Sequence, residues 1–568
     1  MKHDNDVINS ITINNLNNVE QYDKKGNKIF TQPKNIEQLL LSVKLLCLRG
    51  FVVLKKKWGT LARIAIENDG KRHYVVMFGI GLLNFLATTP FSIIIILPLS
   101  FGTALFIIKA RISKSLRSQL LTLFLFLFGY FTSIFWWFVM PLTSDFLHLF
   151  WLTPFALFGL PGVMAGIFIP FFACGLWLYK KYFYCDKQAD LMFVIIFIVC
   201  WFISEYVRGH FILGGFPWML FGHFVPYSFA IQLVKWLGID LYSILFLLLV
   251  LVPYLLIYNR GNEMIRNVCY SVLGLWIINC VGGTMYLIVH PAEKLGVNLF
   301  ASQANFAANA YMTADAANKI IDKNVKMLSI LSMTKRPTLM IMPEGTLNMN
   351  IDGGSSLAKY LGRIVPNDNS LLLVGGVNAR GVSPYNVVYA LNHDGRIVDM
   401  YKKQKLVPFG EYIPLRKWLP RLTRSITGDS FDFATDGQND LFIFYKNLPI
   451  IYPIICYESI FPDYVKNNID ISREQLKKDI TNDYAARVGV SSLDERKELI
   501  VNVTNDVWMG WSVGSYQHFL MNRFLAVATG LPVVRVSNNG FSAFIDSCGR
   551  VRAKTKLNQE DLLFVGTI

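Results

Sequence analysis

The chain has 568 residues, of which 53% are hydrophobic and only 17% are charged, and its formal net charge is +16. A soluble domain usually carries about 25% charged residues, so this balance indicates a membrane protein. The basic residues gather in short loops between apolar runs, which favours contact with anionic lipid and argues against nucleic acid as a partner.

The N-terminal stretch, residues 1–72, is a polar and basic leader without the pattern of a signal peptide. Within it, residues 37–67 mix an apolar run with a lysine cluster, which predicts an amphipathic helix lying in the membrane interface. A solvated tail is the alternative interpretation of the same residues.

Residues 73–290 predict a bundle of about seven membrane-spanning helices, since a span needs about 20 apolar residues. The expected spans are two helices within 73–108 and one each near 118–141, 148–179, 190–207, 238–258 and 267–289. The loops 109–117, 180–187 and 259–266 are basic. Seven spans with a cytoplasmic N-terminus place all three loops inside, so everything after residue 290 is expected outside.

Two charged residues, Glu205 and Arg208, stand three positions apart at a membrane edge. Charges there are costly and usually have a partner or a function. They predict either a functional pair or a structural pair that joins two helices.

Residues 295–568 predict an α/β domain in which short apolar strands alternate with helical stretches. The expected strands are VNLFASQ, PTLMIMPE, LLLVGGV, NVVYALN, PIIYPIIC, LIVNVTND, PVVRVSN and FSAFID. Several follow one another across short turns, so a mixed sandwich of two sheets flanked by helices, in the order α-β-β-α, is favoured over a parallel βαβ series. No GxGxxG or P-loop motif and no CxxC pair is present, so we expect no nucleotide, cofactor or metal.

Three candidate catalytic side chains lie at the ends of predicted strands. Glu344 lies near the end of TLMIMPEG, Lys403 ends VDMYKK, and Cys456 ends PIIYPIIC. Each alone is more often structural than catalytic, because a strand-ending cysteine is usually an inert core residue and a lysine in a basic run is usually solvated.

The residues that flank these three positions favour a catalytic role instead. The order MPEGT, YKKQKLVPFGEYIP, CYESIFPD and TNDVWMGWSVGSYQHF resembles the nitrilase, or carbon–nitrogen hydrolase, superfamily. The LVPFGEYIP and TNDVWMG stretches, joined to an N-terminal membrane bundle, resemble the apolipoprotein N-acyltransferases in particular. That resemblance implies a Glu–Lys–Cys triad of Glu344, Lys403 and Cys456.

The resemblance also implies supporting roles for Glu411, Tyr457 and Glu458. Glu344 would accept the thiol proton, and Lys403 would stabilise the thiolate and the oxyanion, with a backbone N–H at Tyr457 as a second donor. Glu411 would hold Lys403 or assist proton transfer, and Glu458 would orient the turn at the cysteine.

The implied reaction proceeds in two steps. Cys456 would take an acyl chain from a membrane phospholipid, and the resulting thioester would pass it to the N-terminal amine of a diacylglyceryl-cysteine lipoprotein. The implied location is the bacterial cytoplasmic (inner) membrane, with the catalytic domain on the outer, periplasmic face. Relatives usually end in a further membrane helix, and no such apolar run follows the last expected strand.

The sequence supports predictions at three further places. Trp418, Leu419 and Arg421 lie in a basic, apolar stretch that would dip into the interface and meet phosphate headgroups; an ordinary surface loop is the alternative. Trp508 would wall the acyl pocket or pack the core. The charged stretch 466–497 looks like a helical, exposed insertion.

Two other functions remain open. A membrane-tethered nitrilase-type amidase or hydrolase would use the same triad and pass the acyl group to water. A non-catalytic membrane protein would use the domain as a binding platform, which the intact triad argues against.

Overall fold

The computed structural model describes residues 70–143, 150–184, 189–259, 261–307, 314–329, 334–381, 383–414, 416, 432–437, 442–446, 448–479 and 496–566. The leader up to residue 69, with its expected interfacial helix, lies outside these residues, as do Trp418, Leu419 and Arg421.

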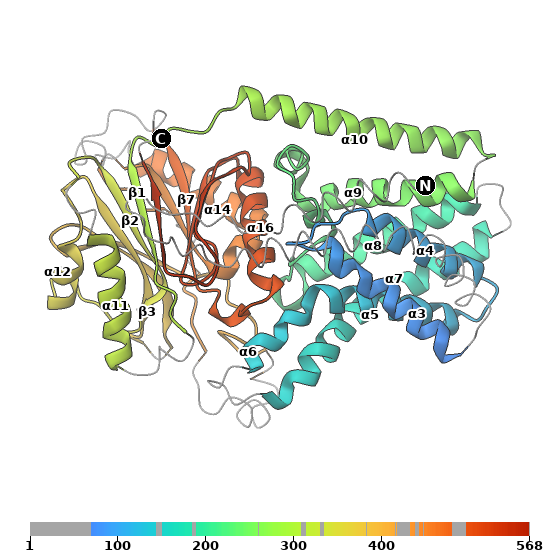
Figure 1. The fold of residues 1–568 in the computed structure, drawn as a ribbon, viewed down its shortest axis with the longest axis horizontal. Coiled ribbons are helices and arrows are strands. Elements are labelled where there is room, and N and C mark those ends of the chain that lie inside the picture. The colour runs from blue at the N-terminus through green and yellow to red at the C-terminus, as the bar shows by residue number, and fades with distance from the viewer. Residues whose placement is uncertain are drawn as a thin grey trace, which may run out of the picture. The chain divides into compact units, whose positions relative to one another are not determined.

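Every apolar run expected to be helical between residues 73 and 290 is helical (Figure 1). The helices are α3 (Lys71–Leu82), α4 (Ile96–Ala110), α5 (Leu116–Phe135), α6 (Met140–Thr143), α7 (Leu160–Leu178), α8 (Ala189–His210), α9 (Val234–Tyr258) and α10 (Glu263–Val289). Among the described residues, five helical stretches are long and apolar enough to cross a membrane: Leu116–Thr143, Phe150–Phe183, Ala189–His210, Val234–Tyr258 and Glu263–Val289. The chain is therefore an integral membrane protein, but the shorter α3 and α4 leave the expected count of seven spans unconfirmed.

Two glycines allow α3 and α5 to cross closely. A Cβ atom on Gly81 would lie 2.0 Å from the carbonyl oxygen of Phe126, and one on Gly129 would lie 2.1 Å from the carbonyl oxygen of Phe78. Small residues permit this backbone approach between membrane helices, where packing rather than the hydrophobic effect drives association.

Replacing Gly129 with alanine is expected to destabilise the bundle by about 1–3 kcal/mol, because the new methyl group meets rigid backbone. Thermal unfolding in detergent measures the effect. Gly166→Ala on α7 is the matched control, since no heavy atom lies within 4 Å of its Cβ position. If the two variants have equal melting temperatures, α3 and α5 can move apart at Gly129 without loss of stability.

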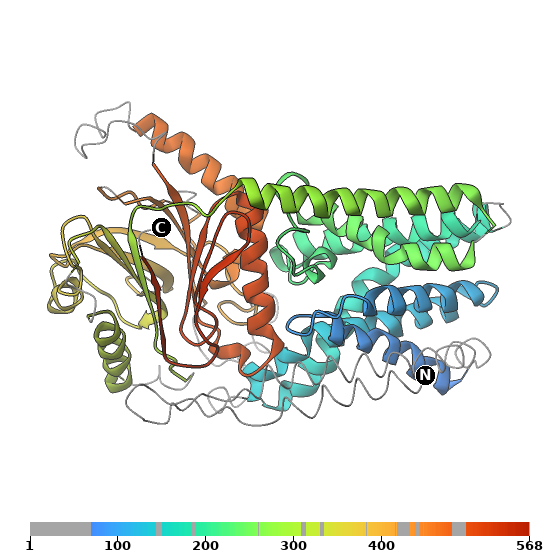
Figure 2. The same ribbon diagram turned by 45° about the horizontal axis from the view of Figure 1, so that its top comes forward.

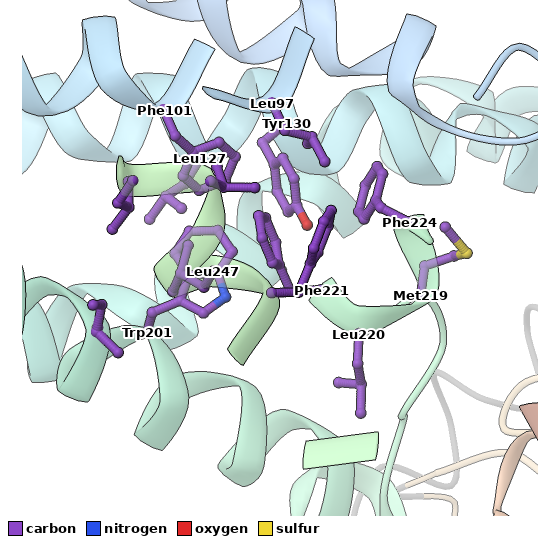
Figure 3. Packing of buried hydrophobic residues seen from close by; sticks show 14 of the residues in the cluster. Leu97, Phe101, Leu127, Tyr130, Trp201, Met219, Leu220, Phe221, Phe224 and Leu247 are labelled. Carbon is purple, nitrogen blue, oxygen red and sulfur yellow. The ribbon is translucent and has the colours of Figure 1, made fainter. Parts of the chain in front are cut away.

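The segment between α8 and α9 folds back into the centre of the bundle. Figure 3 shows Met219, Leu220, Phe221 and Phe224 among side chains of the surrounding helices, including Phe101, Tyr130, Trp201 and Leu247. The Phe221 ring lies 5.0 Å from the Phe101 ring and 5.6 Å from the Trp201 ring. This segment is therefore part of the bundle core.

The pair Glu205 and Arg208 holds this segment from α8. Arg208 Nη1 donates to the carbonyl oxygens of Phe216 (3.0 Å) and Trp218 (2.9 Å), and Glu205 accepts the backbone N–H of Phe221 at 3.0 Å. The expectation that a structural pair would join two helices is therefore corrected, because these contacts join one helix to a loop.

The C-terminal half contains two sheets. Their strands are β1 (Asn298–Gln303), β2 (Thr338–Leu347), β3 (Leu371–Asn378), β4 (Tyr385–Leu391), β5 (Ile397–Lys402), β6 (Ile450–Ile455), β7 (Glu498–Thr504), β8 (Val533–Ser537), β9 (Ala543–Ile545), β10 (Val551–Lys554) and β11 (Asp561–Val565). One sheet has the order β11-β1-β2-β3-β4-β5 and the other β10-β9-β8-β7-β6. The eight expected strands are confirmed, and β5 coincides with the predicted strand VDMYKK that carries Lys403, whereas β10 and β11 are additional strands whose sequences are short and partly polar.

The two sheets pack face to face through a shared apolar core, and every residue of β1 and β6 is buried. Helices α11 (Ala314–Ser329) and α12 (Ser356–Gly362) pack on the first sheet, and α14 (Pro462–Asp479) and α16 (Val513–Thr529) on the second (Figures 1 and 2). This is the expected α-β-β-α order.

Helix α14 corrects the prediction for residues 466–497. Its residues Val465, Ile469 and Leu476 are at most 2% exposed and join the core of the second sheet. The first part of the stretch is therefore a packed layer of the sandwich rather than an exposed helix, and residues 480–495 lie outside the described residues.

Candidate active site

Two of the three predicted triad residues directly follow a strand, whereas Glu344 lies within one, because β2 continues three residues beyond it. Glu344 lies in β2 where its pairing with β3 becomes irregular, Lys403 directly follows β5, and Cys456 directly follows β6. Gly375 in β3 permits the irregularity, because a Cβ atom there would lie 2.6 Å from the Cα atom of Glu344.

Lys403 is buried between two carboxylates. Its Nζ atom lies 2.8 Å from Glu411 Oε1 and 3.6 Å from Glu344 Oε1, and its side chain is 1% exposed. Asn386 Nδ2 donates to both carboxylates, at 2.8 Å to Glu344 and 2.9 Å to Glu411. The ammonium thus offsets the repulsion between two nearby acids.

The electrostatics follow from this burial. Desolvation disfavours the ammonium of Lys403, but Glu411 and Glu344 outweigh it and raise the pKa of Lys403 above its ordinary value. Desolvation, with a contribution from Glu411, raises the pKa of Glu344, while Lys403 opposes this rise. A carboxyl with a raised pKa is a suitable acceptor and donor of protons near neutral pH.

Cys456 begins a tight turn, η9 (Cys456–Ile460), with φ of 49°. A non-glycine residue in this left-handed region is strained and is typical of functional turns. Burial raises the pKa of the Cys456 thiol, the charge of Glu344 raises it further, and Lys403 opposes the rise. The thiol therefore needs a base to become a nucleophile.

Glu458 links the cysteine turn to the lysine. Its Oε1 atom accepts the hydroxyl of Tyr401 (2.8 Å) and the backbone N–H groups of Gln404 (2.7 Å) and Lys405 (3.1 Å), and its Oε2 atom accepts the N–H of Ile455 at 2.7 Å. One buried carboxylate therefore fixes the backbone on both sides of the site.

Tyr457 faces the membrane bundle. Its hydroxyl donates to the carbonyl oxygen of Gly215 at 3.4 Å, and that of Tyr412 donates to the carbonyl oxygen of Leu213 at 3.4 Å. The nucleophile turn and the loop that carries Glu411 therefore both border the segment between α8 and α9.

Trp508, also predicted at the site, lies in the short helix η11 (Val507–Met509) and is 39% exposed. Its role as a wall of an acyl pocket stays a prediction. Among the described residues, no group of three or more His, Cys, Asp or Glu side chains is placed to hold a metal ion.

A buried network beneath the cysteine turn was not foreseen. His518 Nε2 lies 3.0 Å from Ser459 Oγ and 3.2 Å from the carbonyl oxygen of Cys456, and its Nδ1 lies 3.0 Å from Asp506 Oδ1. Arg535 pairs with Asp506. A charged residue inside the apolar strand VVRVS was the available signal, because a buried arginine requires a partner.

Comparison with known proteins follows the two halves of the chain. The family model described as "Apolipoprotein N-acyltransferase N-terminal domain" matches residues 80–252, and "Carbon-nitrogen hydrolase" matches residues 486–567. Glu344, Lys403 and Cys456 lie outside both matched segments.

Similar proteins cover most of the chain. A Rickettsia typhi protein named apolipoprotein N-acyltransferase is 28% identical over 85% of this chain and 90% of its own length. One of the same name from Rhodopseudomonas palustris is 28% identical over 89% of this chain and 92% of its own length. A solved Saccharomyces cerevisiae member of the nitrilase superfamily aligns at 14% identity over 48% of this chain and 92% of its own, with a TM-score of 0.32.

These matches confirm the resemblance predicted from the motifs. The chain is an integral membrane relative of the apolipoprotein N-acyltransferases, which are acyltransferases of the carbon–nitrogen hydrolase superfamily.

Proposed function

We propose that this chain is an N-acyltransferase that moves a fatty acyl chain from a membrane phospholipid, through a thioester on Cys456, to the N-terminal amine of a diacylglyceryl-cysteine lipoprotein. The observation that carries the proposal is the buried Glu344–Lys403–Glu411 cluster beside a cysteine turn whose next residue contacts a membrane-bundle loop. The apolipoprotein N-acyltransferase relatives supply the acceptor class.

In the first step, Glu344 takes the thiol proton and the Cys456 sulfur attacks the ester carbonyl carbon of the phospholipid. Lys403 and the backbone N–H of Tyr457 stabilise the oxyanion of the tetrahedral intermediate. The ester C–O bond then breaks, and the lysophospholipid leaves with the proton that Glu344 returns. The burial of Lys403 supports this assignment, since a fixed charge acts most strongly where water is excluded.

In the second step, the amine of the lipoprotein attacks the thioester carbonyl carbon. A carboxylate of the cluster, Glu344 or Glu411, takes a proton from the amine nitrogen, the C–S bond breaks, and Cys456 recovers its thiol. The product is an amide. A site bordered by a membrane bundle supports this choice, because both substrates are lipids and the thioester must outlast water.

We place the catalytic half on the outer face of the bacterial cytoplasmic membrane. The basic loops at 109–117, 180–187 and 259–266 support this orientation through the positive-inside rule.

The proposal is tested by trapping the intermediate. Wild-type protein in vesicles of phosphatidylethanolamine with a labelled first-position chain is expected to carry one labelled acyl group on Cys456, found by mass spectrometry. Cys456→Ala has no sulfur to acylate and is expected to carry no labelled acyl group at this position. Cys548→Ala, a change at a buried cysteine outside the cluster, is the control and should retain the label on Cys456.

A second arm separates transfer from hydrolysis. Adding a diacylglyceryl-cysteine peptide should move the label onto the peptide amine. Release of free fatty acid with no peptide product would instead identify a hydrolase, and absence of any thioester on wild-type protein would identify a non-catalytic platform.

A further inference from the structure

Helix α16 lies between the membrane bundle and the nucleophile turn. It packs against α9 on one side and against η9 and β8 on the other (Figure 1). Consecutive helical residues point about 100° apart, so Gln517 and His518 face different neighbours. Both side chains are fully buried.

Gln517 binds the bundle. Its Oε1 atom accepts the indole N–H groups of Trp137 at 3.0 Å and Trp218 at 2.8 Å, and its Nε2 donates to the carbonyl oxygen of Ile134 at 3.2 Å. Trp137 follows α5, whereas Trp218 belongs to the segment that Figure 3 shows buried in the bundle core. One amide thus joins two separate parts of the bundle to α16.

His518, the next residue, binds the nucleophile turn. Its Nε2 atom faces Ser459 Oγ and the carbonyl oxygen of Cys456, and its Nδ1 atom is held by Asp506, itself paired with Arg535. The Trp218 ring also lies 5.6 Å from the His518 ring. The contact with the bundle and the contact with the turn are therefore one residue apart.

We propose that Gln517 is a positioning residue that sets the register between the membrane bundle and the Cys456 turn, with His518 as the contact that passes this register to the turn. The proposal rests on the proposed function in one respect, that the acyl donor reaches Cys456 from the bundle side. A misplacement of about 1 Å in such a register can slow a reaction about 100-fold.

The test separates position from stability. Gln517→Leu leaves two buried indole N–H groups without an acceptor, so it is expected to lower the melting temperature and to slow acylation of Cys456 by vesicle phosphatidylethanolamine by about tenfold or more. Adding Trp137→Phe and Trp218→Phe removes the orphaned donors. The triple variant is expected to recover the melting temperature but to keep the slow acylation. Recovery of both together would overturn the proposal, since the bonds would then only stabilise the fold.

A soluble short-chain thioester serves as a second donor, because it does not arrive through the bundle. The triple variant is expected to react with this soluble thioester at a rate within about twofold of wild type. If its reactions with the thioester and with the phospholipid are slowed equally, Gln517 does not set the position of the turn relative to the bundle. Gln232→Leu is the matched control. Gln232 is also buried; it donates to the Ser228 carbonyl (2.6 Å) in its own segment and to the Cys548 carbonyl (3.0 Å) in the catalytic half, and neither partner belongs to the Cys456 turn.

Hydrogen exchange gives a readout that does not depend on activity. The triple variant should speed amide exchange at residues 456–460, whereas Gln232→Leu should not. If amide exchange at residues 456–460 is unchanged, Gln517 does not position the Cys456 turn, even if acylation of Cys456 becomes slower. If wild-type protein forms no thioester from phospholipid, the proposed function fails, and the exchange result still decides the role of Gln517.

Discussion

Lys403→Met is expected to abolish acyl transfer and to destabilise the catalytic domain. The ammonium lies 2.8 Å from Glu411 and 3.6 Å from Glu344, and the Lys403 side chain is only 1% exposed. Its loss removes the group proposed to stabilise the oxyanion, which is expected to lower the rate of thioester formation by about 10³-fold or more. It also leaves two buried carboxylates without a counter-charge, which is expected to cost about 3–5 kcal/mol of unfolding free energy.

The pH dependence of this loss has a definite sign. Desolvation and the charge of Glu411 raise the pKa of Glu344, whereas Lys403 lowers it. Without Lys403 that opposition is lost, so the folded-state pKa of Glu344 rises further above the ordinary glutamate value of about 4.3. The folded variant then binds more protons than the unfolded chain, so its stability falls as the pH rises from about 4.3 through the raised pKa. Denaturant unfolding at several pH values should show the deficit growing from acid to neutral pH.

Lys402→Met is the control for the lysine prediction. Lys402 is the preceding residue, but its side chain is 25% exposed and pairs with Asp436 at 2.8 Å. Its replacement is expected to change stability by less than about 1 kcal/mol. If Lys402→Met and Lys403→Met lose stability and activity to the same extent, the burial of Lys403 between Glu344 and Glu411 does not explain the loss.

The architecture was predictable because its signals are local. Runs of about 20 apolar residues indicate membrane helices, and short apolar runs bounded by turns indicate buried strands. The same signal does not fix the number of spans, because α3 and α4 are short elements within one apolar stretch. Helix α14 was misjudged because charge dominates its composition, whereas Val465, Ile469 and Leu476 repeat along one face.

The site could be predicted only in part, because only some of its residues carry a local signal in the sequence. Lys403 and Cys456 follow strands, Glu344 lies within one, and all three stand in family motifs, so the sequence marks them as candidates for a triad that stays a proposal. Asn386 bridges two carboxylates, yet it opens an ordinary strand and carries no motif of its own. The Trp137–Gln517 bond joins residues 380 positions apart, and no local pattern encodes such a contact.

Glu458→Gln is expected to disrupt the site although glutamine has almost the same shape as glutamate. All four contacts of this carboxylate are donors: three backbone N–H groups and the hydroxyl of Tyr401. A carboxamide has one oxygen, so in either orientation its NH₂ group would face a buried N–H. Bonds to a charged acceptor contribute about 1.5–3 kcal/mol each, so the loss is expected to reach about 3–5 kcal/mol.

The consequence for catalysis follows from the position of these donors. Ile455 precedes the nucleophile and Gln404 follows Lys403, so one rotated amide would displace both reacting groups. Melting temperature and thioester formation should therefore fall together in Glu458→Gln. Tyr401→Phe removes a single donor and is expected to cost about 1 kcal/mol with little loss of rate. If the two variants behave alike, the carboxylate does not hold the turn, and the geometry of Cys456 must depend on the His518 side instead.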